Sequence, residues 1–305
     1  MKIKTLIFFF LMATGSQLKA QYYFYNGDYY EADFVYELGG SIGAINSMTD
    51  VGGRKGAGKG FVKDFNLKNT GLSGGLFFSV MYKNSIGLRL EGTFGAVKGD
   101  DKILKNVAAS TSGRYERNLS FRSSISEVVL VGEFHPFEMF VNYNDNRYPP
   151  AVSPYILAGV GYFHFNPQAQ LNGNYIDLQP LHTEGQGFPE YANVKDYKLN
   201  QINFPIGMGA RYDITPIINV RAEIMYRILT TDYLDDVSGK YIEPSVFANH
   251  LSGAKLTQAI LLNDRHIPGA AYSTAHPGGI RGNPSKDSYI SFSLKLGLTL
   301  GRERR

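Results

Sequence analysis

The chain has 305 residues, a formal net charge of only +4 and no cysteine, so disulfides, thiolate metal sites and cysteine nucleophiles are excluded. It has no long basic run, which argues against nucleic acid as a partner. The chain is rich in Gly, Tyr and Phe (34, 21 and 20 residues) and shows almost no helical periodicity, which argues against an ordinary soluble enzyme.

The N-terminus predicts a secretory signal peptide. Met1–Lys4 is basic, Thr5–Ala13 is a short apolar run, and Leu18–Ala20 offers a small-residue cleavage site. The apolar run is too short to span a bilayer, which needs about 20 residues. We therefore expect a signal peptide at 1–20 and a single domain at 21–305. Because no cysteine follows the cleavage site, we expect no lipoprotein anchor.

Eight segments alternate apolar and polar residues with a period of two, which is the pattern of a membrane-spanning β-strand. The last is the clearest, because the even positions from 290 to 300 are all Ile, Phe or Leu, whereas the odd ones are Ser, Lys, Gly or Thr. In chain order the predicted strands are Phe34–Ala44, Leu72–Tyr82, Ile86–Val97, Arg122–Phe134, Ser153–Phe165, Gln201–Tyr212, Pro216–Ile228 and Ile290–Leu300.

The connections between these strands alternate between short and long. Backbone polar groups in lipid are all satisfied only if the strands close on themselves, and short periplasmic turns opposite long external loops are typical of outer-membrane barrels. The sequence therefore predicts an all-β, eight-stranded antiparallel transmembrane β-barrel with long external loops. The short links are Lys83–Ser85, Val141–Pro150 and Asp213–Pro216, and the long ones are Met48–Asn69, Lys98–Phe121, Asn166–Leu199 and Thr231–Lys286.

The inward parity of the predicted strands carries five acids and five bases. The interior of an eight-stranded barrel is just wide enough for its own side chains, and an unpaired buried ion costs several kcal/mol. We therefore expect a salt-bridged plug in the lumen rather than a solute pore. The predicted plug consists of Glu37, Arg89, Glu91, Glu127, Glu133, Arg211, Arg221, Glu223, Arg227 and Lys295.

Three carboxylates, those of Asp232, Asp235 and Asp236, lie within five residues at the base of the last long loop. They could bind Ca²⁺, but their spacing is not that of an EF-hand loop, and Leu234 interrupts the possible ligands. The alternative, which we favour, is a loop base in which the carboxylates cap backbone N–H groups and pair with a nearby arginine. Arg281 lies at the other root of the same loop and is the expected partner.

No motif for catalysis or cofactor binding stands out. The six histidines show no compact metal-ligand spacing, and nothing singles out a nucleophile beside a histidine. The segment Gly52–Gly60 resembles a phosphate-binding loop, but Gly60 stands where Ser or Thr is required. We therefore expect no catalytic residue, no metal and no cofactor, and an enzyme at the external rim is the less favoured alternative.

The chain ends in a basic tail that contains Arg302, Arg304 and Arg305, immediately after the last strand and on the expected periplasmic side. The tail is either solubilising charge at a membrane boundary or a contact for a periplasmic partner. Together with Tyr143–Pro149 and Asp213–Pro216 it forms the candidate partner surface. It does not end in the aromatic residue that closes many outer-membrane barrels.

Several stretches resemble the PorG-like family of outer-membrane β-barrels, which is found in Bacteroidota-type bacteria. Tyr36–Asn46 followed by Asp50 resembles that family's opening strand, and Asn203–Gly209 is similar to its sixth strand. Thr231–Gly239 (TDYLDDVSG) and Arg281–Pro284 are similar to its two markers in the last loop, and the first of these is the most specific part of the resemblance.

The resemblance implies a non-enzymatic component of the type IX protein secretion system. Such a barrel tethers a periplasmic ring, built by a lipoprotein and its partner protein, to the outer membrane, while the cargo crosses through a different and larger barrel. Two alternatives stay open. One is a small structural or ligand-binding outer-membrane barrel without a secretion role, and the other is a channel whose charge plug opens. In each case we expect the outer membrane and its lipid to surround the protein.

Overall fold

The computed structural model describes residues 29–53, 66–110, 113–140, 152–269 and 275–304. The predicted signal peptide (1–20), the segment Tyr143–Pro149, most of Gly52–Gly60 and Arg305 lie outside these described residues.

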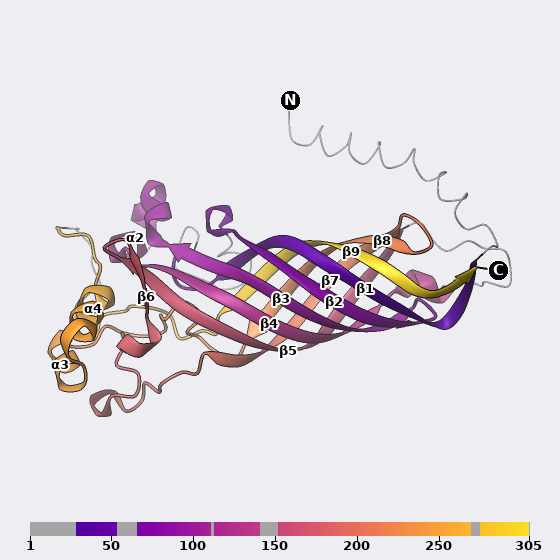
Figure 1. Cartoon of the computed structure of the whole chain (residues 1–305). Helices are drawn as coiled ribbons and strands as arrows, with labels where there is room; N and C mark the ends of the chain where they lie inside the picture. The colour runs from indigo at the N-terminus through magenta and orange to yellow at the C-terminus, as the bar shows by residue number, and fades with distance from the viewer. Residues whose placement is uncertain (1–28, 54–65, 111–112, 141–151, 270–274, 305) are drawn as a thin grey trace.

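The described residues form nine antiparallel strands, which are β1 (Tyr29–Met48), β2 (Gly71–Tyr82), β3 (Ile86–Asp100), β4 (Ser120–Phe134), β5 (Val152–Leu171), β6 (Asn174–Asp177), β7 (Asn200–Asp213), β8 (Ile218–Leu229) and β9 (Ser288–Arg304). Eight of them follow one another around the wall in the order β4-β3-β2-β1-β9-β8-β7-β5 (Figure 1), and pairing of β4 with β5 closes the barrel. The predicted eight-stranded antiparallel transmembrane barrel is therefore confirmed. The ninth strand, β6, is a short hairpin partner of β5 that sequence analysis missed.

The two faces of the wall differ as the alternation predicts. In β4, Val128 and Leu130 are 53% and 43% exposed on the outer face, whereas Val129 and Val131 are fully buried in the lumen. On β9 the outward apolar run extends from residue 290 to residue 300. Ten residue steps of about 3.3 Å on a strand tilted by about 40° span about 25 Å, the height of the apolar band of a membrane barrel.

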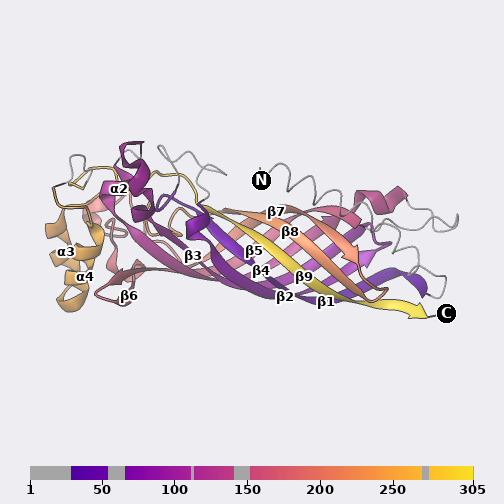
Figure 2. The ribbon, with the colours of Figure 1, turned by 90° about the horizontal axis from the view of Figure 1, so that it is seen from above.

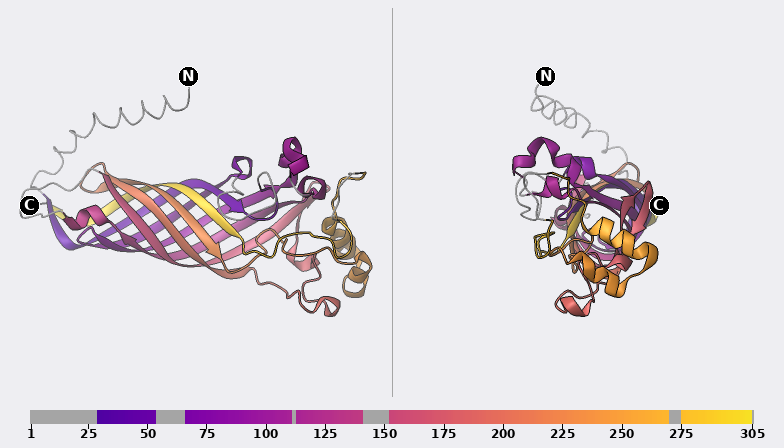
Figure 3. Two further views of the ribbon diagram at one scale, coloured as in Figure 1. Left: turned by 180° about the vertical axis from the view of Figure 1, so that it is seen from behind. Right: turned by 90° about the vertical axis from the view of Figure 1, so that its left-hand side faces the viewer.

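The barrel is elongated, and its long loops gather at the external end, opposite the C-terminus (Figures 1 and 2). Short helices lie in these loops, and α3 and α4 cover part of that end when the barrel is viewed along its axis (Figure 3). In the parts of the chain that the structure describes, no helix is long and apolar enough to cross a membrane. The helices are α2 (Arg114–Arg117), α3 (Phe247–His250), α4 (Gly253–Asn263) and the 3-10 segments Leu67–Asn69, Asp101–Ser110, Pro136–Phe140, Gln179–Leu181, Pro189–Tyr191 and Pro244–Val246.

Strands β3, β4 and β5 continue past the other strands toward the external end (Figure 1). β5 runs to Leu171, although the predicted strand ended at Phe165. The prediction stopped early because Asn166, Gln168 and Gln170 replace apolar residues on the outer face, where lipid no longer sets the pattern.

The apolar interior is divided into three clusters along the barrel axis. One lies in the lumen around Val129, Tyr155 and Met225. A second fills the external mouth and includes Phe163, Phe165, Tyr289, Leu234 and Val237, so the loop after β8 packs into the barrel opening. The third lies outside the barrel, between the end of β5 and the long loops, and we call it the external lobe. Its buried members are Ala169, Leu178, Leu181, Phe188, Ile242, Phe247, Ala259 and Leu262.

Candidate functional site

The lumen holds a network of buried charges centred on Arg89. Its guanidinium nitrogens lie 3.1 Å from Glu91 Oε2, 2.5 Å from Glu133 Oε1 and 2.7 Å from Glu223 Oε2. Arg89 has no exposed surface, and the side chains of its partners are at most 4% exposed. One arginine from β3 therefore joins strands on opposite sides of the wall.

Two further cations complete this network. Arg221, on β8, forms an ion pair with Glu37 and places Nη1 2.8 Å from Glu133 Oε2. Lys295, on β9, lies 3.1 Å from Glu223 Oε1 and also contacts Glu91. Glu91, Glu133 and Glu223 are each shared between two cations, whereas Glu37 pairs with Arg221 alone. Removal of any one cation therefore leaves a buried carboxylate under-compensated.

A second, smaller centre lies nearer the external mouth. Arg227 Nη2 is 3.0 Å from Glu127 Oε2, and the same carboxylate accepts hydrogen bonds from the Tyr289 hydroxyl (2.7 Å) and Asn203 Nδ2 (2.6 Å). The two centres hold every residue of the predicted plug except Arg211. Arg211 instead pairs with Asp213 at the short-turn end, at 2.8 Å, where the acid is partly exposed.

Phe77 lies at the middle of the cations. Its ring centroid is 5.9 Å from Arg89 Cζ, 5.6 Å from Arg221 Cζ and 5.7 Å from Lys295 Nζ, distances at which a ring face attracts a cation. Gly39 makes room for this ring, because a Cβ at Gly39 would meet Phe77 Cε1 at 2.5 Å and a main-chain oxygen of β9 at 2.3 Å.

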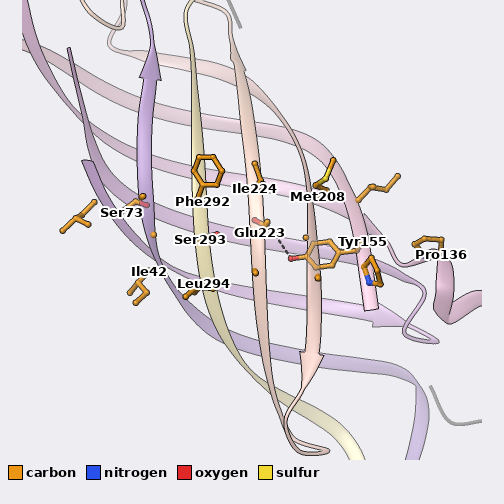
Figure 4. A pocket seen from close by; sticks show the side chains of 18 residues that line it. Ile42, Ser73, Pro136, Tyr155, Met208, Glu223, Ile224, Phe292, Ser293 and Leu294 are labelled. Carbon is orange, nitrogen blue, oxygen red and sulfur yellow. Dashed lines mark hydrogen bonds between the residues drawn. The ribbon is translucent and has the colours of Figure 1, made fainter. Parts of the chain in front are cut away.

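Tyr155 links strand β5 to the buried charges by a hydrogen bond. Its hydroxyl donates a hydrogen bond of 2.8 Å to Glu223, drawn as a dashed line in Figure 4. On the outer side of the same strands runs an open apolar groove, where Ala44, Ala210 and Ala222 lie between larger residues such as Phe292. The groove lies within the apolar belt, so we assign it to contact with lipid.

The carboxylates at the loop base are buried and act as hydrogen-bond acceptors. Asp235 accepts from the backbone N–H groups of Val51 and Val237, both at 3.0 Å. Asp236 has φ of 64°, a conformation that Asp tolerates better than most residues. Its carboxylate accepts from Thr183 Oγ1 (2.5 Å) and from the hydroxyl of Tyr197.

Arg281 is buried beside these acids, but its ion-pair partner is not one of them. Its Nη1 lies 3.0 Å from Glu184 Oε1 and 2.7 Å from the main-chain oxygen of Asp236. The expected Arg–Asp bridge is therefore replaced by a bridge to the preceding long loop, because the Asp236 carboxylate turns toward Thr183 and Tyr197. Asp232 accepts from Ser238 Oγ within its own loop.

Arg117 is the main residue that sequence analysis missed. It pairs with Asp101 at 2.9 Å within its own loop, donates to the Asp50 main-chain oxygen at 2.8 Å and donates to the Arg281 main-chain oxygen. With Glu184 and Arg281, it ties all four long loops into one unit, which we call the external cap. The RYER stretch around Arg117 carries no motif that would have marked it.

Burial raises the pKa of several acids in the external cap. The pKa of Asp50 is raised to about 6, that of Asp235 to about 7 and that of Asp236 to about 6, in each case mainly because burial disfavours the charged carboxylate. The pKa of Asp232 is raised to about 8 for the same reason, and that of Asp287 is raised well above its ordinary value. The cap therefore binds protons more tightly than a solvent-exposed set of aspartates would.

Within the described residues no group of three or more His, Asp or Glu side chains is arranged to hold a metal ion. The loop-base carboxylates instead accept hydrogen bonds from backbone N–H groups and from hydroxyl groups. The geometry of the described site is that of structural capping.

No protein-family model matches the chain, and no curated protein sequence matches it. Among solved structures, the chain is similar to outer membrane protein OprG from Pseudomonas aeruginosa, with 10% identity over 89% of this chain and 97% of that one, and a TM-score of 0.38. It is also similar to E. coli outer membrane protein W, with 15% identity over 89% and 100% of the two chains and a TM-score of 0.35. Ail, the attachment invasion locus protein of Yersinia pestis, matches with 12% identity over 87% and 99% and a TM-score of 0.35.

Proposed function

We propose that this protein is a non-enzymatic outer-membrane barrel of the type IX protein secretion apparatus, which anchors the periplasmic ring to the outer membrane. The supporting observation is the lumen, where Arg89, Arg221 and Lys295 are buried among shared carboxylates. A barrel filled in this way acts through its surfaces. Secreted cargo then requires a separate and larger passage.

The family resemblance supports the same proposal. Its most specific stretch, Thr231–Gly239, lies against its second loop marker, Arg281–Pro284, since the Gly239 main-chain oxygen accepts hydrogen bonds of 2.9 Å from the N–H groups of Arg281 and Gly282. The stretches therefore form one structural unit at the centre of the external cap.

The proposed contact surface for the ring is at the short-turn end. The turn between β7 and β8 exposes Ile214 (43%) and Ile217 (47%), apolar side chains suited to a protein partner. Arg302 and Arg304 lie at the end of β9, and their side chains, like Arg305, fall outside the described residues.

Deleting the gene tests this function. We expect proteins that carry the type IX C-terminal signal to accumulate in the periplasm, and normal surface display of those proteins would refute the secretion role. The variants I214S/I217S and R302E/R304E/R305E are expected to reduce co-purification of ring proteins. The variant K255E/K286E, on the external side, is the control and is expected to leave co-purification unchanged.

The second candidate function is a barrel that binds an external ligand through its loops. The external lobe favours it, because loops with their own apolar core, including Phe188 and Phe247, can present a defined surface. This candidate predicts normal secretion in the deletion strain and no periplasmic partner. A channel is the third hypothesis. Planar-bilayer recording distinguishes it, because the filled lumen is expected to be electrically silent.

A further inference from the structure

The outward face of the sheet changes character just above the apolar belt. Where β3, β4 and β5 extend past the other strands, the apolar side chains of the belt give way to polar ones, while the inward face stays apolar with Phe121, Ile125 and Phe165. The cross-strand rows on the outer face are Phe94–Ser126–His164, then Ala96–Ser124–Asn166, then Lys98–Arg122–Gln168–Asp177.

The three rows lie at the height of the lipid headgroups, because the first row still contains the exposed apolar Phe94 of the belt. From the first row to the third is four residue steps, about 13 Å along the strands and about 10 Å along the membrane normal for a tilt of about 40°. The polar layer of a phospholipid bilayer adds about 5–8 Å on each side of the hydrocarbon. The third row therefore lies at the outer edge of the headgroup layer or just beyond it.

Two exposed cations lie opposite each other in the third row. Lys98 and Arg122 are cross-strand partners and both are exposed. Like charges placed directly opposite destabilise a sheet, and neither residue forms an ion pair with any other described residue. Arg122 instead lies over the ring of Tyr175, with Cζ 5.5 Å from the ring centroid. An anionic group between the two cations would relieve their repulsion.

Beside the cations, one carboxylate fixes two amides. Asp177 Oδ1 accepts hydrogen bonds from Asn166 Nδ2 at 2.9 Å and from Gln168 Nε2 at 2.7 Å. No described donor reaches the amide oxygens of either residue, so these oxygens remain available to hydroxyl donors. Tyr175, 50% exposed, offers a ring face next to them. Oriented amides next to an aromatic ring are suited to a saccharide, which is rich in hydroxyl groups.

We propose that this outward ladder (Lys98, Arg122, Asn166, Gln168 and Tyr175) binds the phosphorylated saccharide headgroup of a glycolipid in the external leaflet. Lys98 and Arg122 bind the phosphate, and Tyr175 with the two amides binds the sugar. The position determines the occupant, because the ladder continues the lipid-facing side of the same strands, and the layer directly outward from the hydrocarbon is the lipid headgroup. This inference does not depend on the secretion role.

Titration of the full mature barrel in detergent tests the proposal, with lipopolysaccharide, dephosphorylated lipopolysaccharide and phosphatidylglycerol as probes. Wild-type protein is expected to bind lipopolysaccharide more tightly than phosphatidylglycerol. The variant K98Q/R122Q is expected to lose about tenfold in lipopolysaccharide affinity, as the loss of two exposed charge contacts implies. Dephosphorylation of the probe is expected to weaken binding to wild type but not to K98Q/R122Q.

The matched control is K195Q/K255Q, which removes the same charge from exposed loop lysines away from the ladder. It is expected to bind as wild type does. The variant Y175L keeps both cations and is expected to lower affinity for lipopolysaccharide but not for phosphatidylglycerol. Each variant must show the heat-modifiable gel migration of a folded barrel. Equal lipopolysaccharide affinity in K98Q/R122Q and the control, or equal binding of both lipids by wild type, would overturn the proposal.

Discussion

Arg281 and Glu184, which are 97 residues apart in the sequence, form a buried ion pair of 3.0 Å at the centre of the external cap. The pair joins the loop between β5 and β7 to the loop between β8 and β9. The Glu184 carboxylate also accepts hydrogen bonds from the N–H groups of Ser238 and Gly239, both at 3.0 Å. A single carboxylate therefore holds both ends of the last long loop.

Removing one partner of this pair is expected to loosen the cap. The variant R281M leaves the Glu184 carboxylate buried without its cation, at a cost of about 3–5 kcal/mol of local stability. The double variant E184Q/R281M is expected to recover part of that loss, which a double-mutant cycle measures. Amide hydrogen exchange at Ser238 and Gly239 reports the opening. The exposed Lys286 supplies the control K286M, and exchange in R281M no faster than in K286M would contradict the coupling.

The stability of the cap is expected to fall as pH rises from about 5 to 8. The pKa values of Asp50 (about 6) and Asp235 (about 7) lie above the ordinary value of 3.8, so the folded cap binds these protons more tightly than the open one. Their contribution is complete below about pH 4 and is lost as pH rises through the folded values.

The variant D50N checks this dependence, because an amide oxygen can still accept the Asn283 N–H. The ratio of cap exchange rates between D50N and wild type at the same pH removes the intrinsic pH effect on exchange. We expect the ratio of the D50N exchange rate to the wild-type exchange rate to be lower at pH 8 than at pH 5. The variant E243Q, at an exposed acid, should give a ratio that does not change with pH.

In the lumen, Arg89 and Arg211 are expected to differ sharply as mutation sites. The variant R89M leaves three partner carboxylates under-compensated, so we expect a loss of about 3–5 kcal/mol. The variant R211M breaks one pair with the partly exposed Asp213, so we expect about 0–1 kcal/mol. The temperature at which each folded barrel loses its heat-modifiable gel migration measures the difference. Equal losses would mean that the central network is not the stabilising one.

The barrel could be predicted from sequence because lipid enforces a period of two on every strand that crosses it. The same rule assigned the lumen charges, since parity alone places Glu37 and Arg221 on the inner face. Their pairing could not be predicted, because it depends on strand tilt and on rotamers that join residues as far apart as Glu37 and Arg221, 184 positions in the chain.

The external cap was harder to predict, because no periodicity governs loops. Asp232, Asp235 and Asp236 were visible as a cluster, yet Glu184 and Arg117 carry no local sign of their role. Their importance comes from contacts between loops. The hairpin strand β6 was not predicted for the same reason, since it pairs with β5 beyond the membrane, where polar residues occupy the outer face.

Phe77 and Phe78 are neighbours on β2 whose side chains point to opposite faces of the barrel wall. We therefore expect substitution by leucine to destabilise the barrel at Phe77 and to have little effect at Phe78. The variant F77L removes the ring face that contacts Arg89, Arg221 and Lys295, each contact being worth about 0.5–2 kcal/mol, so the three together imply a loss of roughly 1.5–6 kcal/mol. The variant F78L exchanges one apolar side chain for another on the lipid-facing side, where Phe78 is 43% exposed, and should cost little. Thermal unfolding followed by gel migration compares the two. Similar midpoints for F77L and F78L would show that the ring fills space in the lumen without stabilising its cations.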